Sequence, residues 1–600
     1  MNEVFDNRST FYISQTVPVK AGDGLRFSLL LHDGCNCCDA WLKIRADSEQ
    51  YCWVPMVWQE KVNGVFNRWV ADFTPPKADL YWYSFEFEGN WRRNVITRVG
   101  EGKGDITDRG QEWQLTVYDA DFTVPEKYSG GLIYQIFPDR FCNSGTSKQN
   151  VPDDRYMVTD WYSQPAWRQN NGAYSLCNDY YGGDLQGIIK KLPYIASLGV
   201  TMIYLNPIFE AHSNHRYNTA DYMKIDPSLG TEADFVMLCQ EAEKHGIAII
   251  LDGVFSHTGD DSRYFNKYRR YEDDGAYNSQ SSKWSSWFKF DRWPDKCSCW
   301  WGVPSLPETV EEDTSFTDFI CGEKGVLRHW LRLGASGWRL DVADELPDCF
   351  LDSVRSAIKA EKPDAFLLGE VWEDASNKIS HGGRRRFLLG KQLDSVMNYP
   401  FRTAIIDFLR GGDAASIKDV VEGLICNYPA PALNSMMNHI GTHDTERILS
   451  VLGGAPLSLT REGQSSVQLA DHQVERGKAL LRLAAVLQYT LPGIPSLYYG
   501  DEAGCEGLRD PFNRMGYPWG KEDASLIEFY KKLGQLRKEK VFAGGSFTTL
   551  YAKNGTFAYL RQKYDSRVLV AVNRGETEQA VEFEGTTYMV APNGWIIEKI

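Results

Sequence analysis

The chain has 600 residues and a net charge of −15, so it is an acidic protein that is too long for a single hydrophobic core. The acidic charge argues against nucleic acid as a partner, because phosphate contacts require Lys and Arg side chains. The sequence has no apolar run of about 18 residues, and its first residues lack the basic and apolar segments of a signal peptide. We therefore expect no membrane span and a cytoplasmic location.

The aromatic and cysteine contents bear on the type of ligand and on the redox state of the thiols. Aromatic residues make up 13% of the chain, with 19 Trp and 31 Tyr, which fits either a large core or stacking on sugar rings. The 13 Cys are spread over the whole length and, without an export signal, predict reduced thiols. Cys35, Cys37 and Cys38 form one cluster and Cys297 with Cys299 another, but neither has the paired spacing of a zinc site.

Residues 1–125 are predicted to form an N-terminal β-sandwich of the carbohydrate-binding type. Alternating apolar runs at 25–31 and 81–87 are separated by Asp, Gly, Asn and Pro clusters, a pattern typical of strands joined by turns. This part also contains Trp53, Trp58 and other tryptophans, and the sequence leaves open whether they pack in the core, face a glycan or face a second subunit.

Residues 126–540 are predicted to form a (β/α)8 barrel, because eight apolar strands alternate with helical stretches. The predicted strands are 131–137, 201–206, 248–254, 337–343, 366–371, 393–398, 436–441 and 496–500. The spacer after the third strand is too long for one helix, so we expect an inserted subdomain at about 258–315. Residues 541–600 return to short strands and predict a C-terminal β-sandwich.

Polar segments follow the third to the seventh predicted strands. They are Asp252–His257, Gly337–Asp341, Leu368–Trp372, Asn398–Pro400 and Gly441–Asp444. Active residues of such barrels lie at the carboxyl ends of the strands. Three of these segments each deliver one carboxylate, at Asp341, Glu370 and Asp444, and a buried carboxylate is costly unless it has partners or a task. The arrangement therefore predicts acid/base and nucleophilic chemistry in one cleft.

Two of the carboxylates suit the two roles of a retaining glycosidase, which needs them about 5–5.5 Å apart. Asp341 follows Arg339 by two residues on one strand, so both side chains share a face and the Arg charge favours an ionised nucleophile. Glu370 follows an apolar run, and an apolar wall would keep its proton available for a general acid that later acts as base. The alternatives are a structural Arg–Asp pair and a strand-end Glu in a surface loop.

Together these segments resemble the α-amylase family of retaining glycoside hydrolases, and within it the neopullulanase, cyclomaltodextrinase and maltogenic amylase group. The resemblance covers about residues 125–600 and implies a catalytic set of Asp341, Glu370 and Asp444. It also implies that Tyr217 stacks under the reacting sugar, that Asp252 organises the nucleophile, and that other side chains bind the substrate. The implied substrate-binding residues are His215, Tyr217, Asp252, His257, Arg339, Trp372 and His443.

The resemblance also bears on calcium. In many relatives the residue before the His that corresponds to His257 is an Asn, which binds calcium or lies next to a calcium ligand. This chain has Ser256 at that position. A second site in relatives uses an Asn/Asp-rich loop and a Gly-Gly-Asp segment. The segment is present at 182–184, but the loop at Asn143 has lost most of its acids. Calcium binds six to eight oxygens, several of them charged. We therefore predict no metal ligands and no required cofactor; a structural calcium stays open without support from the Asn143 loop.

We expect a hydrolase that cleaves α-1,4 bonds in maltooligosaccharides, cyclodextrins, pullulan or starch fragments, with some transfer to sugar acceptors. Trp300–Glu308 stands where the group usually has Met-Pro-Lys-Leu-Asn, and Asp344 where Asn is frequent, which points toward amylopullulanase-like enzymes that also cut α-1,6 bonds. An α-1,6-specific debranching enzyme or a dedicated transglycosylase is the alternative, and a non-catalytic glycan-binding protein is the remote one. In relatives the N-terminal domain contacts a second subunit, so a homodimer stays open.

Overall fold

The computed structural model describes residues 4–168 and 177–600; residues 1–3, which open the predicted N-terminal domain, lie outside the described part. The chain forms two compact units. The N-terminal unit comprises Met1–Thr123, Glu373–Ser395 and Lys418–Leu433, and the barrel unit comprises Val124–Trp372, Val396–Ile417 and Asn434–Ile600. No helix in the described residues is long and apolar enough to cross a membrane. All 13 cysteines are free thiols.

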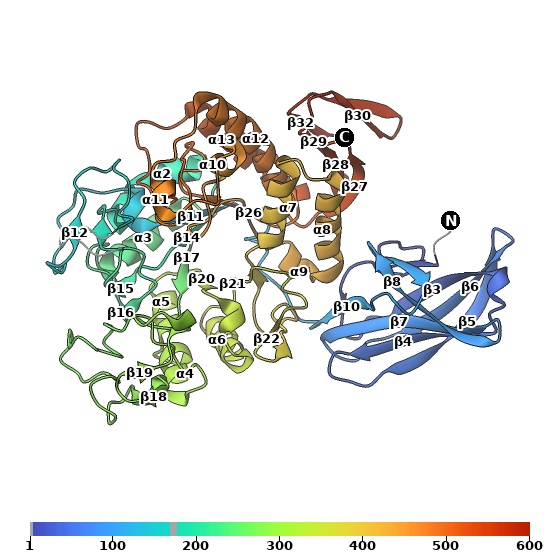
Figure 1. Cartoon of the computed structure of the whole chain (residues 1–600), viewed down its shortest axis with the longest axis horizontal. Coiled ribbons are helices and arrows are strands. Elements are labelled where there is room, and N and C mark those ends of the chain that lie inside the picture. The colour runs from blue at the N-terminus through green and yellow to red at the C-terminus, as the bar shows by residue number, and fades with distance from the viewer. Residues whose placement is uncertain (1–3, 169–176) are drawn as a thin grey trace. The chain divides into compact units, whose positions relative to one another are not determined.

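The N-terminal unit is built on strands β1 to β10, of which Figure 1 labels β3 to β8 and β10. They are β1 (Phe5–Asp6), β2 (Val19–Lys20), β3 (Leu25–His32), β4 (Asp39–Ala46), β5 (Cys52–Val62), β6 (Phe66–Phe73), β7 (Asp79–Gly89), β8 (Arg92–Gly100), β9 (Lys103–Ile106) and β10 (Trp113–Tyr118). The strand path β1-β9-β8-β7-β4-β5-β6-β3 folds back on itself, because Phe27 of β3 packs against Tyr83 and Phe85 of β7. This shared core confirms the predicted antiparallel sandwich.

Two segments that are distant in the sequence complete the N-terminal unit. Arg384, in the hairpin of β22 (Ile379–Ser380) and β23 (Gly383–Arg384), donates to Asp47 at 2.9 Å. Arg8 donates to Glu422 at 3.0 Å, in the last part of α8 (Ala414–Asn427). Ion pairs thus hold two segments of the predicted barrel region against the N-terminal sheet.

The barrel unit contains the predicted parallel barrel. Among the described residues its strands are β11 (Ile133–Ile136), β14 (Met202–Leu205), β17 (Ala248–Gly253), β20 (Gly337–Leu340), β21 (Phe366–Gly369), β24 (Ser395–Val396), β25 (Met437–His439) and β26 (Ile494–Tyr498). Their order is β24-β21-β20-β17-β14-β11-β26-β25, and a parallel bridge from Met397 to Met437 joins the two ends. The (β/α)8 barrel is therefore confirmed.

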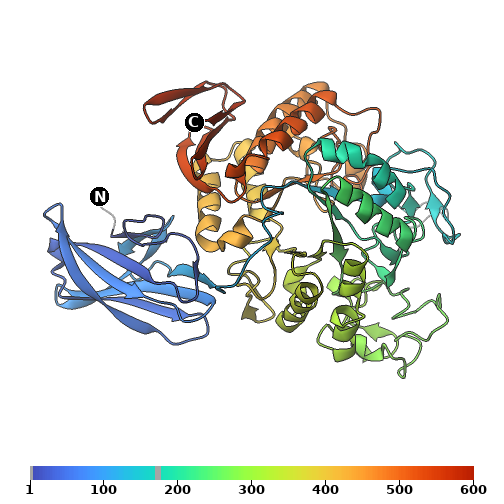
Figure 2. The ribbon, with the colours of Figure 1, turned by 180° about the vertical axis from the view of Figure 1, so that it is seen from behind.

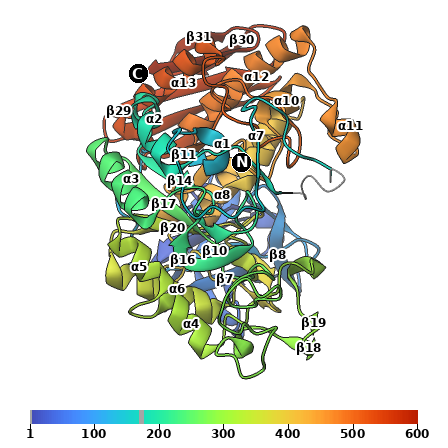
Figure 3. The same cartoon turned by 90° about the vertical axis from the view of Figure 1, so that its left-hand side faces the viewer.

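Helices surround these strands; Figure 2 shows the same ribbon from behind, and Figure 3 labels α2, α3, α5 and α6 outside the strands. Their bounds are α1 (Pro138–Phe141), α2 (Leu185–Ser197), α3 (Glu232–Lys244), α4 (Thr314–Cys321), α5 (Val326–Arg332), α6 (Asp348–Glu361), α7 (Tyr399–Leu409), α9 (Ala430–Leu433), α10 (Ile448–Gly453), α11 (Arg461–Ser465), α12 (Asp471–Thr490) and α13 (Ala524–Leu536). The start of α3 is encoded in its sequence, because Thr231 and Asp234 form a capping box there.

Strand register explains why the polar segments meet. Asp252 on β17 is the direct partner of Arg339 on β20, and Leu340 is the direct partner of Gly369 on β21. The next residues along β20 and β21 are Asp341 and Glu370. Because neighbouring parallel strands end at one edge, the register brings both acids to the same mouth of the barrel.

The predicted insertion and the C-terminal domain are both present. The insertion carries η2 (Ser285–Trp287), the hairpin of β18 (Phe290–Arg292) and β19 (Lys296–Cys297), and η3 (Trp300–Gly302). The C-terminal part pairs β27 (Ser546–Lys553), β28 (Thr556–Lys563), β29 (Ser566–Asn573) and β32 (Gly594–Lys599), and separately β30 (Gln579–Phe583) with β31 (Thr586–Val590). Leu569 of the first sheet shares a core with Val581 of the second, as in a sandwich.

Candidate active site

Arg339 is the hub of the site, because its fully buried side chain contacts three carboxylates. Nη1 lies 2.9 Å from Asp252 Oδ1 and 2.6 Å from Asp341 Oδ1, while Nη2 lies 2.8 Å from Glu370 Oε2. These acids are themselves almost excluded from solvent, with side-chain exposures of 0%, 10% and 4%. One positive charge thus contacts three carboxylates in a site that excludes most water. Charges in such a site interact strongly with one another.

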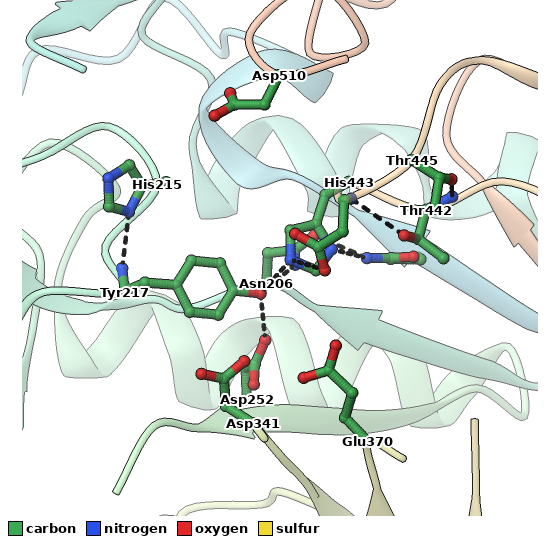
Figure 4. Close-up of polar contacts among 12 residues, drawn as sticks. Asn206, His215, Tyr217, Asp252, Asp341, Glu370, Thr442, His443, Thr445 and Asp510 are labelled. Carbon is green, nitrogen blue, oxygen red and sulfur yellow. Dashed lines mark hydrogen bonds and ion pairs between the residues drawn. The ribbon is translucent and has the colours of Figure 1, made fainter. Parts of the chain in front are cut away.

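The two proposed catalytic carboxylates face one another across this guanidinium. Figure 4 shows the carboxylates of Asp341 and Glu370 turned toward the same space, beside the Tyr217 hydroxyl. Neighbouring nitrogens of the one Arg339 side chain each contact an oxygen of one acid, at 2.6 Å for Asp341 and 2.8 Å for Glu370. One guanidinium thus brings both carboxylates to the same mouth of the barrel.

The surroundings of Glu370 differ from the apolar wall that the sequence suggested. Its Oε2 accepts from the backbone N–H of Val342 at 2.9 Å, and its Oε1 accepts from the Trp372 indole at 3.0 Å. The Tyr399 hydroxyl lies 3.4 Å from Oε1, and its ring stacks on Trp372 with centroids 4.0 Å apart. The prediction of an apolar wall around Glu370 was therefore wrong. Both carboxylate oxygens accept hydrogen bonds, and half-exposed Trp372 lies directly beside the carboxylate.

A second network positions Asp444. Gln135 Nε2 donates to His443 Nδ1 at 2.8 Å, so the neutral ring carries its proton on Nε2. That nitrogen lies 3.0 Å from Asp444 Oδ2 and 2.6 Å from the Tyr217 hydroxyl, which in turn donates to Asp252 at 2.9 Å. Tyr217 and His443 also stack almost in parallel, with centroids 5.2 Å apart. Tyr217, Asp252, His443 and Asp444, all predicted site residues, therefore form one connected network.

Burial dominates the electrostatics of these groups. Burial raises the pKa of Asp341 well above its ordinary value; Arg339 opposes the rise, and the charges of Glu370 and Asp252 add to it. Burial, followed by the charge of Glu370, raises the pKa of Asp444 to about 7. The Asp444 side chain is nevertheless 30% exposed, and water in the open cleft moderates that rise. Burial therefore disfavours the ionised forms of Asp341 and Asp444 in this site.

The remaining predicted histidines occupy different positions. His257 bonds through Nδ1 to the Ser256 hydroxyl at 3.0 Å, and its buried Nε2 has no hydrogen-bond partner in the described residues. Burial lowers the pKa of His257 to about 4, so its ring is neutral at pH 7. His215 accepts from the backbone N–H of Tyr217 at 3.1 Å, and Figure 4 places it beyond Tyr217 from the acids.

Comparison with known proteins now identifies the family. Residues 135–521, more than half of the chain, match the family model described as Alpha amylase, catalytic domain. The chain belongs to the α-amylase family. Amylopullulanase of Thermoanaerobacterium saccharolyticum is 38% identical over 590 residues, which cover 88% of this chain and 45% of that protein. Cyclomaltodextrinase of Thermoanaerobacter pseudethanolicus is 35% identical over 483 residues, which cover 77% of this chain and 74% of that protein.

A solved structure agrees with this α-amylase family assignment. Cyclic alpha-maltosyl-(1→6)-maltose hydrolase from Arthrobacter globiformis superposes with a TM-score of 0.67 at 28% identity, covering 80% of this chain and 100% of that chain. The present chain spans less than half of the length of the matched amylopullulanase. The family is therefore shown, whereas the activity of the whole protein is a proposal.

Sequence reasoning missed several supporting residues of this α-amylase family site. Tyr204 donates to Asp252 Oδ2 at 2.6 Å from the strand beside it. Arg514 donates through Nε to the His443 carbonyl at 3.1 Å and lies 3.7 Å from Asp444 Oδ1. Tyr399 belongs to a polar segment that was singled out without a role for this residue. No local pattern marks Arg514, because it lies in a loop after the eighth strand and not at a strand end.

The loop at Asn143 does not fit the calcium that the α-amylase family resemblance suggested. Asp184 uses Oδ1 to cap α2, accepting from Gly187 N–H at 2.5 Å. Its Oδ2 lies 2.6 Å from the Ser144 hydroxyl and 2.5 Å from the Lys148 ammonium. The same ammonium donates to the Thr146 carbonyl at 2.9 Å. A cation from the chain itself therefore occupies the oxygens that a calcium ion would need.

Proposed function

We propose that the protein is a retaining α-glucan hydrolase whose nucleophile is Asp341 and whose general acid and base is Glu370. The observation that carries the proposal is the single guanidinium of Arg339 that holds both carboxylates at one end of the barrel. Such a pair suits double displacement at one anomeric carbon, whereas an inverting enzyme keeps its carboxyl groups about 6.5–9.5 Å apart.

The reaction would follow from this geometry. Asp341 attacks the anomeric carbon while the proton on Glu370 passes to the leaving glycosidic oxygen, so the bond breaks and a glycosyl ester of Asp341 forms. Glu370, then ionised, takes a proton from water, which attacks the ester and restores Asp341. Asp444 and His443 lie where they can bind hydroxyls of the distorted sugar. A sugar hydroxyl in place of water would give transfer.

The proposed substrates are α-glucans with α-1,4 bonds, including cyclic and branched ones. Support comes from the relatives, which are named as amylopullulanase, cyclomaltodextrinase and a hydrolase of a cyclic sugar with a 1→6 bond. The net negative charge of the protein does not repel an uncharged sugar chain. Cleavage of α-1,6 bonds is proposed as a second activity, on the same grounds and on the Trp300–Glu308 segment.

Product analysis tests this function. We expect the first new reducing end from maltotriose to be the α-anomer, seen by proton NMR before mutarotation, because two inversions retain configuration. A β-anomer as first product would reject the Asp341 ester. Pullulan distinguishes the alternatives: panose supports α-1,4 cleavage, whereas maltotriose alone supports a debranching enzyme. Absence of any new reducing ends would favour a glycan-binding protein.

We further propose that the chain needs no calcium at the Asn143 loop, because Lys148 supplies the positive charge there. Changing Lys148 to Met keeps the aliphatic stem but leaves the buried Asp184 carboxylate without its cation. We expect a loss of about 2–3 kcal/mol in the free energy of unfolding, measured by urea denaturation. Calcium at millimolar concentration should restore part of the loss in Lys148→Met, since the oxygens become free.

The wild-type protein should unfold at the same urea concentration in EDTA as in calcium. Lys190→Met is the matched control, because its ammonium bonds only to the Ser144 carbonyl, at 2.6 Å, among the loop oxygens. We expect a small, calcium-insensitive effect there. A wild-type protein that calcium stabilises strongly would contradict the proposal.

A homodimer formed through the N-terminal unit and a cytoplasmic location are proposed on the family resemblance. The exposed aromatics Trp53, Trp58 and Trp91 give that unit an apolar surface, with 45%, 50% and 106% of each residue exposed. Light scattering over a range of concentrations would decide the oligomeric state.

A further inference from the structure

A carboxylate beside the active site is bound by two tryptophans that the mechanism does not use. Glu345 ends η4 (Ala343–Glu345), four residues after Asp341. Its Oε2 accepts from the Trp300 indole at 2.6 Å and its Oε1 accepts from the Trp301 indole at 2.7 Å. The two indole rings stack, with centroids 5.4 Å apart. We call these three residues the Trp–Glu clamp.

The Trp–Glu clamp packs against His257, one of the predicted substrate-binding residues. The Trp300 ring packs on His257, with centroids 4.9 Å apart, and His257 is the residue whose buried Nε2 has no partner in the described part of the chain. The hairpin that carries both tryptophans is closed by bridges from Cys299 to Pro307 and from Glu308 to His257. Four residues of chain span at most about 14 Å, so Glu345 keeps the clamp close to Asp341.

Trp301 is presented in an unusual way. It is 78% exposed, although burial of an indole is favourable. Its backbone lies in the left-handed region at φ 49° and ψ 27°, which is costly for a residue other than Gly. The hydrogen bond to Glu345 fixes the ring in this orientation. An indole that is exposed, has a strained backbone and is fixed by a hydrogen bond presents one face to solvent, and strained positions cluster at functional sites.

We infer that the outer face of Trp301 is a stacking platform for a glucosyl unit next to the cleavage point, and that Glu345 is the positioning residue that holds it. The apolar face of a pyranose ring matches an indole in size and polarity, and no charge is required. Because both Glu345 oxygens already accept from indoles, this carboxylate serves the platform and not the chemistry. The inference rests on the proposed α-glucan hydrolysis and specifies where the longer substrates bind.

The test compares substrates that reach the platform with one that does not. Trp301→Ala should lower kcat/KM for maltopentaose about tenfold, the value of one aromatic contact, mainly through KM. Activity on an aryl α-glucoside, which has a single sugar unit, should stay within twofold. Trp301→Phe keeps an aromatic face without the N–H donor and should recover most of the loss.

Glu345→Gln keeps one acceptor oxygen and should fall between wild type and Trp301→Ala. The double variant Glu345→Gln/Trp301→Ala should be no worse than Trp301→Ala alone, because both changes act on one platform. Val303→Ala removes an exposed apolar side chain of the same hairpin and is the matched control, with both substrates unaffected.

Equal losses on maltopentaose and on the aryl glucoside, or no loss on either, would overturn the inference. Binding of maltopentaose to the Asp341→Asn protein, measured by calorimetry with and without Trp301→Ala, separates this result from the proposed function. If wild type hydrolyses nothing, the function fails, and calorimetry still decides the platform: a tenfold weaker affinity without Trp301 supports it, and an equal affinity rejects it.

Discussion

Asp341→Asn is expected to lower kcat by about 10⁴-fold or more on every α-glucan, because the change removes the carboxylate that we propose as the nucleophile. Glu370→Gln should lower kcat by about 10²–10⁴-fold on oligosaccharides, since their leaving oxygen needs a proton. The two losses should differ in kind. With an α-glucosyl fluoride, whose leaving group needs no proton, Glu370→Gln should recover ester formation, whereas Asp341→Asn should not.

Glu373→Gln is the matched control for this pair. Glu373 lies three residues after Glu370, but its side chain is 62% exposed and pairs with Lys378 at the surface. We expect kcat within twofold of wild type. A variant of Asp341 that keeps substantial turnover, or a Glu370→Gln protein that forms the ester equally slowly from the fluoride and from maltotriose, would contradict the assigned roles.

Stability should move in the opposite direction to activity in Asp341→Asn. The pKa of Asp341 is raised in the folded protein, chiefly by burial, so folding favours its protonated form. The stability linked to that proton is complete below the unfolded pKa and is lost as pH rises through the folded pKa. At pH 7 the neutral Asn should therefore leave the melting temperature unchanged or higher. This gain should vanish near pH 4, which thermal scans at both pH values would show.

The same shift predicts the acid limb of the activity profile. The proposed reaction requires ionised Asp341, and a raised pKa means that ionisation occurs at a higher pH than for an ordinary Asp. The kcat/KM value should thus fall with decreasing pH at a higher pH than about 3.9, the ordinary Asp value.

The positions of the proposed catalytic carboxylates could be predicted because they depend on strand geometry. The period of two along a strand puts Arg339 and Asp341 on one side, and parallel register carries Glu370 beside them. The family resemblance of whole segments supplied His443 and Tyr217. These inferences depend on order along the chain and on a repeating architecture, which a single sequence contains.

The partners of those groups could not be predicted, because they arrive through contacts that are distant in the sequence. The polar surroundings of Glu370 depend on Val342, whose φ of 39° turns its N–H toward the carboxylate. A β-branched residue is rarely found in the left-handed backbone region, and no local sequence pattern predicts this conformation. Lys148 likewise fills the loop at Asn143 through contacts that composition alone does not reveal.

Arg339→Met is expected to be the most damaging substitution to stability in the barrel. It would leave Asp252, Asp341 and Glu370 buried together without the cation that contacts all three. Removing one partner from a buried ion pair typically costs about 3–5 kcal/mol, because the remaining charge is uncompensated. We expect at least this loss in the free energy of unfolding at pH 7, measured by urea denaturation.

The pH dependence identifies the cause of that loss. Without Arg339, the positive charge that lowers the pKa of Asp341 is absent, so Asp341 should take up its proton at a higher pH than in wild type. Protonation removes its repulsion with the other two acids, and the deficit of Arg339→Met relative to wild type should shrink between pH 7 and pH 5. A deficit that is constant over this range would indicate lost packing and not uncompensated charge.

Arg339→Lys separates the two duties of this residue. An ammonium keeps the positive charge but is a point donor that cannot present two planar nitrogens to Asp341 and Glu370 together. The Lys variant should therefore fold with most of its stability, while kcat falls by about 10²-fold or more, since a shift of about 1 Å in the reacting groups has that effect. Its acid limb should lie between those of wild type and Arg339→Met. If Arg339→Lys were instead as active as wild type, charge alone would be sufficient, and the shared guanidinium would not be what fixes the spacing of the two carboxylates.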